Sequence, residues 1–100
     1  MTWPDARVHC KNLNGDLASF KSEEEVGQLS VASSLWYWIG LKENEKGNWT
    51  WSDGSRVTWI DWAPGQPNKD NSCGILMGKK LYDNPCTWTF YFICKTQGMC

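Results

Sequence analysis

The sequence predicts an α+β fold with two helices early in the chain, followed by small, mainly antiparallel sheets and a long loop. Apolar residues recur with helical spacing in the first third of the chain, whereas the later part consists of short aromatic runs separated by turn residues. Five cysteines in 100 residues indicate that disulfides staple the fold. A chain of this length is typical of one domain, so we expect residues 1–100 to form a single unit.

The first helix is expected to begin after Thr2, whose hydroxyl is a common N-cap, with Asp5 in the first turn. Apolar residues then recur along one face of this helix: Trp3, Ala6, Cys10 and Leu13. The helix should end at Asn14-Gly15, where Gly15 supplies the left-handed conformation that follows the last turn.

A second helix start is indicated by Ser22 followed by three glutamates, which together form a capping box at the positive end of a helix. We interpret Glu23–Glu25 as a solvated helix start rather than as a cation site. The inward-facing residues of this helix are predicted to be Val26, Leu29 and either Ala32 or Ser33.

From Leu35 onward the pattern changes to short strands and turns. Apolar, aromatic and β-branched runs predict strands over residues 36–41, 48–51, 73–77, 81–82 and 90–94. Ser52-Asp53-Gly54-Ser55 is interpreted as a hairpin-type turn. Residues 61–72 contain two prolines, a glycine and several Asn and Asp residues, with little to pack, and so predict a long loop.

The charge balance argues against a nucleic-acid or membrane-surface protein. Ten basic and eleven acidic residues give a net charge of −1, so the chain has no broad field to attract a polyanion. No apolar run approaches the ~18 residues that a membrane span needs, so we expect no membrane insertion by this segment. No secretory leader is visible, so an exported protein would have lost its leader, or the chain is a fragment.

The cysteines predict an oxidising, extracellular environment. They are Cys10, Cys73, Cys86, Cys94 and Cys100. No two of them are spaced as a CxxC pair and His9 is the single histidine, so disulfides explain them better than a zinc site. Four cysteines allow three pairings, which spacing alone does not separate. We expect Cys100 to be the odd one, free or bridging to another segment or to a second chain in a disulfide-linked dimer.

Six short stretches occur in an order and spacing that point to one family. They are Trp3-Pro4-Asp5-Ala6 with Cys10, Gly15–Phe20, Trp38–Leu41, Trp49–Ser55, Gln66-Pro67-Asn68 and Phe92–Cys94. Together they resemble the C-type lectin-like domain over residues 2–96. The resemblance implies that Cys10 pairs with Cys94 and Cys73 with Cys86. It also implies a strand before the first helix, so the domain is expected to be truncated at its N-terminus.

The resemblance further implies a calcium-dependent sugar site in the long loop. The residues that match its metal ligands are Gln66, Asn68, Asn71 and Asp83, with Asp70 as a further candidate anion; Gln66, Asn68, Asn71, Tyr82 and Asp83 would contact the sugar. Pro67 matches a proline that is typically cis. Leu81-Tyr82-Asp83 stands where the family usually has Trp-Asn-Asp, so Tyr82 replaces a calcium ligand.

Two departures from the family weaken this site. Gln66-Pro67-Asn68 combines the mannose-type and galactose-type sequences, so the sugar class stays open. Most of the candidate ligands are neutral, so we expect Ca²⁺ affinity on the order of millimolar. An auxiliary calcium site would need acids near Glu43 and Lys46, and the lysine argues against it.

We therefore predict an extracellular carbohydrate-binding module, secreted or part of an ectodomain, whose partner is a glycan or glycoprotein. The alternative is a calcium-independent module of the same fold that binds a protein ligand, with Trp62, Tyr82 and Trp88 as candidate anchors. An enzyme is not expected, because His9 and Cys10 are adjacent on a helix and point apart. Asn48-Trp49-Thr50 also matches the N-glycosylation sequon.

Overall fold

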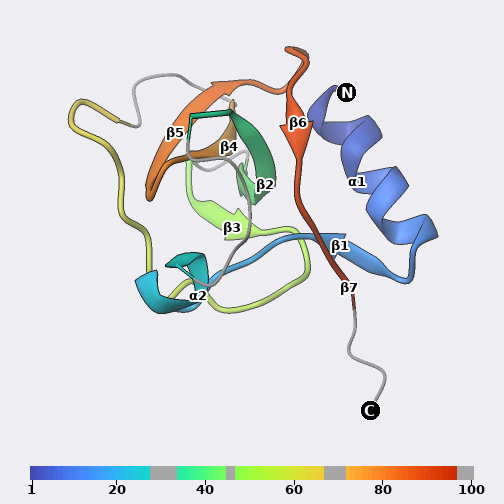
Figure 1. The fold of residues 1–100 in the computed structure, drawn as a ribbon, viewed down its shortest axis with the longest axis horizontal. Helices are drawn as coiled ribbons and strands as arrows, with labels where there is room; N and C mark the ends of the chain where they lie inside the picture. Colours follow the sequence, from blue (N-terminus) through green and yellow to red (C-terminus); the bar gives the residue numbers. More distant parts are fainter. Residues whose placement is uncertain (28–33, 45–46, 67–71, 97–100) are drawn as a thin grey trace.

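The computed structural model describes residues 1–27, 34–44, 47–66 and 72–96 (Figure 1). Two helices and seven strands follow one another in these residues, and the prediction of an α+β fold is confirmed. Their order is α1 (Trp3–Asn12), β1 (Gly15–Leu17), α2 (Glu23–Gly27), β2 (Tyr37–Glu43), β3 (Trp49–Trp51), β4 (Ser72–Met77), β5 (Lys80–Pro85), β6 (Tyr91–Phe92) and β7 (Cys94–Thr96). No described helix is long and apolar enough to cross a membrane.

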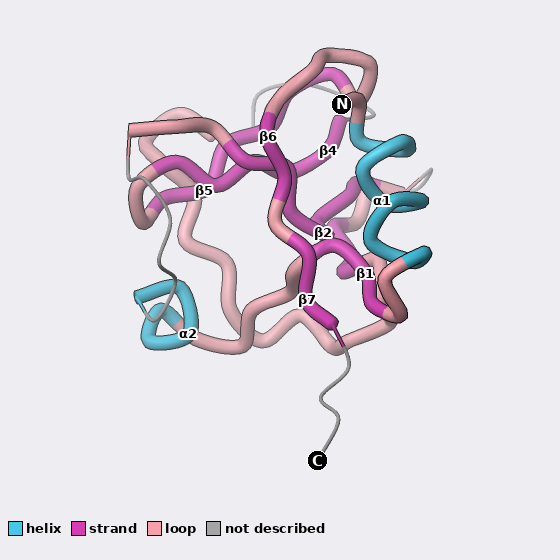
Figure 2. The backbone as a smooth tube through the Cα atoms, turned by 45° about the vertical axis from the view of Figure 1, so that its right-hand side comes forward, coloured by secondary structure: helices cyan, strands magenta, loops and turns pink. Residues whose placement is uncertain are grey.

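The strands form two sheets. β1 pairs antiparallel with β7, and a larger sheet has the order β3-β2-β4-β5, with β6 pairing parallel to β2. The other pairs of the larger sheet are antiparallel. Figures 1 and 2 show α1 lying beside the small sheet. β5 is the edge strand of the larger sheet on the side away from α1.

The larger sheet divides the core into two layers because neighbouring strand residues point to opposite faces. On β2, Trp38 packs toward α1, whereas Ile39 packs toward the other layer. The layer on the α1 side consists of Trp3, Ala6, Cys10, Leu17, Trp38, Cys73 and Ile75. The opposite layer consists of Ala18, Phe20, Val26, Ile39, Leu41, Trp51, Leu76 and Leu81.

The first helix begins as predicted but ends differently. Thr2 Oγ1 accepts a hydrogen bond from the Asp5 N–H at 3.4 Å. The left-handed residue after the helix is Asn14, with φ 64°, and not Gly15, so that prediction was wrong. Asparagine tolerates this conformation better than other side chains do, which leaves Gly15 to begin β1 in extended geometry.

At the start of the second helix Ser22 caps as predicted, but the reciprocal bond of the capping box is displaced, because Glu25 accepts from the N–H one residue before the cap. Ser22 Oγ accepts from the Glu25 N–H at 3.4 Å, and Glu25 Oε1 accepts from the Lys21 N–H at 2.6 Å. Val26 is buried, as predicted. Leu29, Ala32 and Ser33 lie outside the described residues.

The turn after β3 corrects one detail of the sequence analysis. The Gly54 N–H donates to the Trp51 carbonyl at 3.0 Å, which closes a turn over residues 51–54 with Gly54 at φ 85°. The chain then continues without a strand through residue 61, and β3 pairs only with β2 among the described strands. The turn therefore leads into the long loop instead of closing a hairpin.

Both disulfides have the pairing that the family resemblance implies. Cys10 on α1 joins Cys94 on β7, with 5.3 Å between their Cα atoms. Cys73 on β4 joins Cys86, just after β5, with 5.2 Å between their Cα atoms. The first disulfide ties α1 to the small sheet. The second joins the start of β4 to the residue that follows β5. Cys100 lies outside the described residues.

Candidate functional site

The first half of the long loop is anchored along β5. Trp62 forms a parallel bridge with Leu81, the Ala63 N–H donates to the Leu81 carbonyl at 2.9 Å, and the Leu81 N–H donates to the Asp61 carbonyl at 3.0 Å. Ala63 is 4% exposed. The expectation that this loop has little to pack was therefore wrong for residues 61–63, which cover the outer edge of β5 (Figure 1).

Side chains reinforce this anchoring. Lys80 Nζ lies 2.8 Å from Asp61 Oδ2, and the hydrogen bond to this carboxylate raises the pKa of Lys80 above its ordinary value. The Trp62 ring meets the Trp49 ring edge to face, with 4.9 Å between centroids. Trp62 is thus largely a packing residue, and β5 and β3 position the loop from two directions.

Beyond this anchor, three polar residues meet at β5. The Asp83 N–H donates to Gln66 Oε1 at 3.2 Å, and the Ser72 hydroxyl donates to Asp83 Oδ2 at 2.9 Å. Asp83 is 1% exposed and Ser72 is 0% exposed. Gln66 and Ser72 flank residues 67–71, so both described ends of that segment are bonded to Asp83. We call Gln66, Ser72 and Asp83 the Asp83 site.

The strand pairing explains why these groups converge. In the β4–β5 register, Gly74 opposes Asp83 and Ser72 opposes Pro85, so Ser72 and Asp83 project from the same face of the sheet. Tyr82 projects from the other face, where its ring meets the Trp36 ring at 4.8 Å. The structure brings Gln66 and Asp83 together but directs Tyr82 away from them.

The remaining predicted ligands, Asn68, Asp70 and Asn71, lie outside the described residues, as does Pro67. In the described part of the chain, no three His, Cys, Asp or Glu residues gather in a way that could hold a metal. The Asp83 site offers a carboxylate, a carboxamide oxygen and a hydroxyl. Such oxygen donors fit a hard cation such as Ca²⁺ better than they fit Zn²⁺.

The sequence analysis missed three contributors to this region, namely Asp61, Ser72 and Lys80. Ser72 directly precedes Cys73 and carried no signal of its own. Asp61 and Lys80 are 19 residues apart, and only the pairing of the loop with β5 brings them together. The sequence shows an acidic residue at the start of the loop and a lysine at the start of the strand. It does not show that the loop pairs with the strand in a register that brings the two together.

A second carboxylate cluster lies at the base of the domain, between α1, β1 and the turn after β3. Asp16 accepts hydrogen bonds from the Ser52 hydroxyl at 2.8 Å, from the Leu17 N–H at 2.8 Å and from Arg7 Nε at 3.2 Å. Burial alone would raise the pKa of Asp16, but these donors outweigh it and hold the pKa below its ordinary value. This cluster joins three elements, and we assign it to the stability of the fold.

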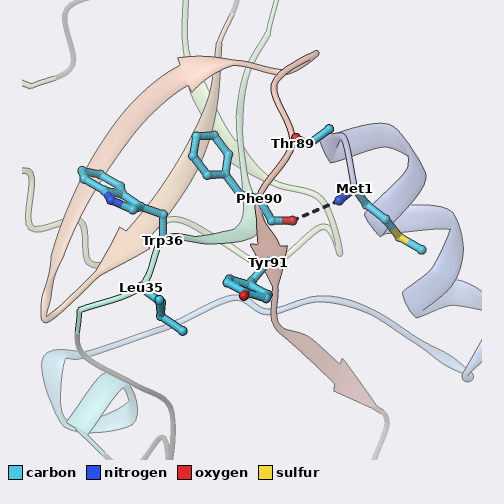
Figure 3. A pocket seen from close by; sticks show the side chains of 6 residues that line it. All are labelled: Met1, Leu35, Trp36, Thr89, Phe90 and Tyr91. Carbon is cyan, nitrogen blue, oxygen red and sulfur yellow. Dashed lines mark hydrogen bonds between the residues drawn. The ribbon is translucent and has the colours of Figure 1, made fainter.

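An aromatic groove runs along β6 (Figure 3). It has a volume of about 370 Å³, and its lining residues are Met1, Leu35, Trp36, Thr89, Phe90 and Tyr91. Tyr91 is 62% exposed, and the neighbouring Trp88 is 50% exposed. None of the six lining side chains is charged. In the described part of the chain, this groove is a second candidate binding surface, and its lining differs from the polar Asp83 site.

The adjacent His9 and Cys10 are both engaged elsewhere. Cys10 Sγ is bonded to Cys94, so it is not a thiol nucleophile. The His9 ring packs edge to face against Phe92, with 5.2 Å between centroids.

The chain has the C-type lectin-like fold, as its superposition on a C-type carbohydrate-recognition domain shows. The sequence profile of the Lectin C-type domain family matches residues 1–96, and the chain belongs to this family. It is 38% identical to human C-type lectin domain family 4 member K over 106 residues, covering 94% of this chain and 32% of that relative. The chain thus spans about a third of that relative's length.

Two solved structures are similar over nearly the whole chain. The cow carbohydrate-recognition domain of CD23, crystallised in the presence of GlcNAc2Man3 oligosaccharide, superimposes with a TM-score of 0.89 at 31% identity, covering 100% of this chain and 83% of that one. A calcium-independent type II antifreeze protein superimposes with a TM-score of 0.82 at 33% identity, covering 94% and 77%. The same fold therefore occurs in a carbohydrate-recognition domain and in a calcium-independent protein.

Proposed function

We propose that this chain is an extracellular, non-enzymatic module that binds sugar hydroxyls with the help of Ca²⁺ held at the long loop. The observation that carries this proposal is the attachment of both Gln66 and Ser72 to Asp83. Five residues connect these two anchors, and a fully extended segment of that length spans at most about 18 Å. Asn68, Asp70 and Asn71 belong to this short connection, which is why we include them among the proposed ligands.

The proposed ligands are Gln66, Asn68, Asn71 and Asp83, with Asp70 as a further anion. When bound, Ca²⁺ would supply open positions that accept sugar hydroxyl oxygens, since it takes six to eight oxygen ligands. Gln66 contributes a carboxamide oxygen with two lone pairs, one of which accepts from the Asp83 N–H, leaving a second for a cation. Affinity follows ligand charge, so two aspartates among neutral amides predict Kd on the order of millimolar.

The test is retention on immobilised mannose and galactose with Ca²⁺ and with a chelator. We expect retention only with Ca²⁺, and loss of retention in Asp83→Asn. Asp5→Asn is the matched control, because Asp5 is an exposed aspartate on α1, far along the chain from the loop. Equal retention of the wild-type chain with and without Ca²⁺ would overturn the calcium part of the proposal.

A second candidate function is supported by the aromatic groove along β6. Tyr91 and Trp88 are large, exposed aromatic residues, the kind that dominates protein interfaces. The similarity to a calcium-independent protein of this fold supports it as well. If no sugar column retains the chain but a protein ligand does, loss of that binding in Tyr91→Ala, with no effect of chelator, would favour this function. Tyr82 is a weaker anchor, since its ring packs on Trp36.

A disulfide-linked dimer through Cys100 is a further prediction. It is checked by non-reducing electrophoresis of the wild-type chain and of Cys100→Ser, which should run as a monomer.

A further inference from the structure

The connection between β2 and β3 ends in an exposed asparagine, Asn48. Asn48 is exposed and is the first residue of Asn48-Trp49-Thr50, the one Asn-x-Ser/Thr sequence in the chain. Its backbone is fixed by Asn44, which donates from its N–H to the Asn48 carbonyl at 2.7 Å and accepts from the Asn48 N–H at Oδ1, at 3.0 Å. Among the described residues, no hydrogen bond engages the Asn48 carboxamide.

The surroundings of Asn48 leave room for a large substituent. Gly47, Asn48 and Thr50 are all exposed, and the Thr50 hydroxyl lies on the surface, where it donates to the Lys42 carbonyl at 3.3 Å. The two disulfides indicate folding in an oxidising secretory compartment, which is also where asparagine-linked glycans are added. Sequence, exposure and compartment therefore agree.

We infer that Asn48 is an acceptor site for an N-linked oligosaccharide. In the transfer, Nδ2 of Asn48 forms a bond to the anomeric carbon of the first sugar of a lipid diphosphate-linked oligosaccharide. The bond from that carbon to the phosphate oxygen breaks, the oxygen keeps the electron pair, and the amide loses one proton to a base of the transferase. No oxidant or reductant is needed.

The position also gives the glycan a structural role. β3 is an edge strand of the larger sheet, and within the described part of the chain no strand pairs with its outer side. The opposite edge, β5, is covered by the Trp62 bridge to Leu81. Open edges favour pairing between molecules, and proteins cover or shorten them. A bulky, solvated glycan at the start of β3 protects the edge that the loop does not cover.

The test is expression of the full chain in a eukaryotic secretory host, followed by intact mass measurement. The wild-type chain should carry one added oligosaccharide mass, which peptide-N-glycosidase removes while converting the asparagine to aspartate. Asn48→Gln and Thr50→Ala should lack the added mass entirely, and Thr50→Ser should retain it. Variants are measured in cell lysate as well as in medium, so that a secretion defect does not hide the result.

An unmodified wild-type chain, or an Asn48→Gln variant that keeps the added mass, would overturn the inference. The edge role has its own readout. Enzymatic removal of the glycan from folded protein should increase the fraction of self-associated material in light scattering. An unchanged fraction would contradict protection of β3.

Discussion

Asp16 and Asp83 are both nearly buried, but the domain uses them in different ways. Asp16 lies at the base and is surrounded by charged and polar donors from three elements, including Arg7 at 3.2 Å and Lys11 at 3.6 Å. Asp83 lies beside the long loop, where the described contacts come from the Ser72 hydroxyl and, at its own N–H, from Gln66. The Asp16 carboxylate holds three elements of the fold together. Asp83 instead lies with the oxygen atoms of Gln66 and Ser72 beside the long loop.

One disulfide joins α1 to β7 and the other lies at the β4–β5 pair, near the long loop. Removing either one gives the largest loss of stability that we expect. Cys10 and Cys94 are 84 residues apart in sequence, whereas Cys73 and Cys86 are 13 apart. Loop-closure entropy then predicts that Cys10→Ala with Cys94→Ala costs about 4–5 kcal/mol, against about 3 kcal/mol for Cys73→Ala with Cys86→Ala. Denaturant unfolding of both double variants checks this. Equal costs would show that the two regions do not differ in this respect.

Asp16 should also determine how the stability of the domain changes in acid. The pKa of Asp16 is lower in the folded state than in the unfolded state, so its contribution to stability is present above the unfolded pKa and is lost as the pH falls through the folded pKa. We expect Asp16→Asn to cost about 2 kcal/mol at neutral pH, since it weakens charge-assisted hydrogen bonds.

The pH profile supplies the control for this prediction. The free energy of unfolding of the wild-type chain should fall below about pH 4, and Asp16→Asn should flatten that fall. Asp53 should contribute in the same direction: burial opposes the shift, but hydrogen bonds from Ser19 and Ser55 lower the pKa of its carboxyl. An identical acid slope in wild type and Asp16→Asn would contradict this assignment.

At the loop, Gln66 should connect stability with calcium binding. Gln66→Ala removes the acceptor for the Asp83 N–H and should cost about 1 kcal/mol. Gln66→Glu keeps an acceptor oxygen and adds a negative charge, so it should bind Ca²⁺ more tightly than the wild-type chain. Calcium titration by calorimetry checks both variants. If Gln66→Glu binds no better, Gln66 is an anchor of the loop only.

The smallest effect is expected at the exposed Lys80–Asp61 pair. Lys80→Met should lower the thermal midpoint only slightly, and raising the salt concentration should remove most of the difference, because exposed ion pairs are screened. Thermal melts at low and high salt make the comparison. A large loss that does not depend on salt would show that packing of the lysine side chain contributes more to the thermal midpoint than its charge does.

Much of the fold could be predicted because several strong local signals coincide. The Thr2 cap, the Ser22 cap and the aromatic strand around Trp38 depend on near neighbours in sequence, and all three formed as expected. The left-handed residue after α1 was misassigned because Asn14 and Gly15 are both suited to that conformation. Short-range chemistry did not choose between them.

The candidate site was only partly predictable because it depends on strand register. Gln66 and Asp83 were identified through the family resemblance, and the structure brings them together. Strand pairing determines that Tyr82 and Asp83 project from opposite faces of β5. It also determines that Trp62 forms its bridge with Leu81. A shift of one residue would exchange the two faces, and no local pattern in residues 61–72 specifies that register.

The most direct test of calcium binding at the Asp83 site is thermal unfolding of the wild-type chain and Asp83→Asn, each with Ca²⁺ and with a chelator. At a Ca²⁺ concentration ten times Kd, the wild-type chain should gain about 1.4 kcal/mol, which corresponds to a rise in midpoint of about 6–11 °C for a domain of this size. Asp83→Asn should not respond. An unchanged midpoint in the wild-type chain, or an equal rise in both, would contradict a calcium site built on Asp83.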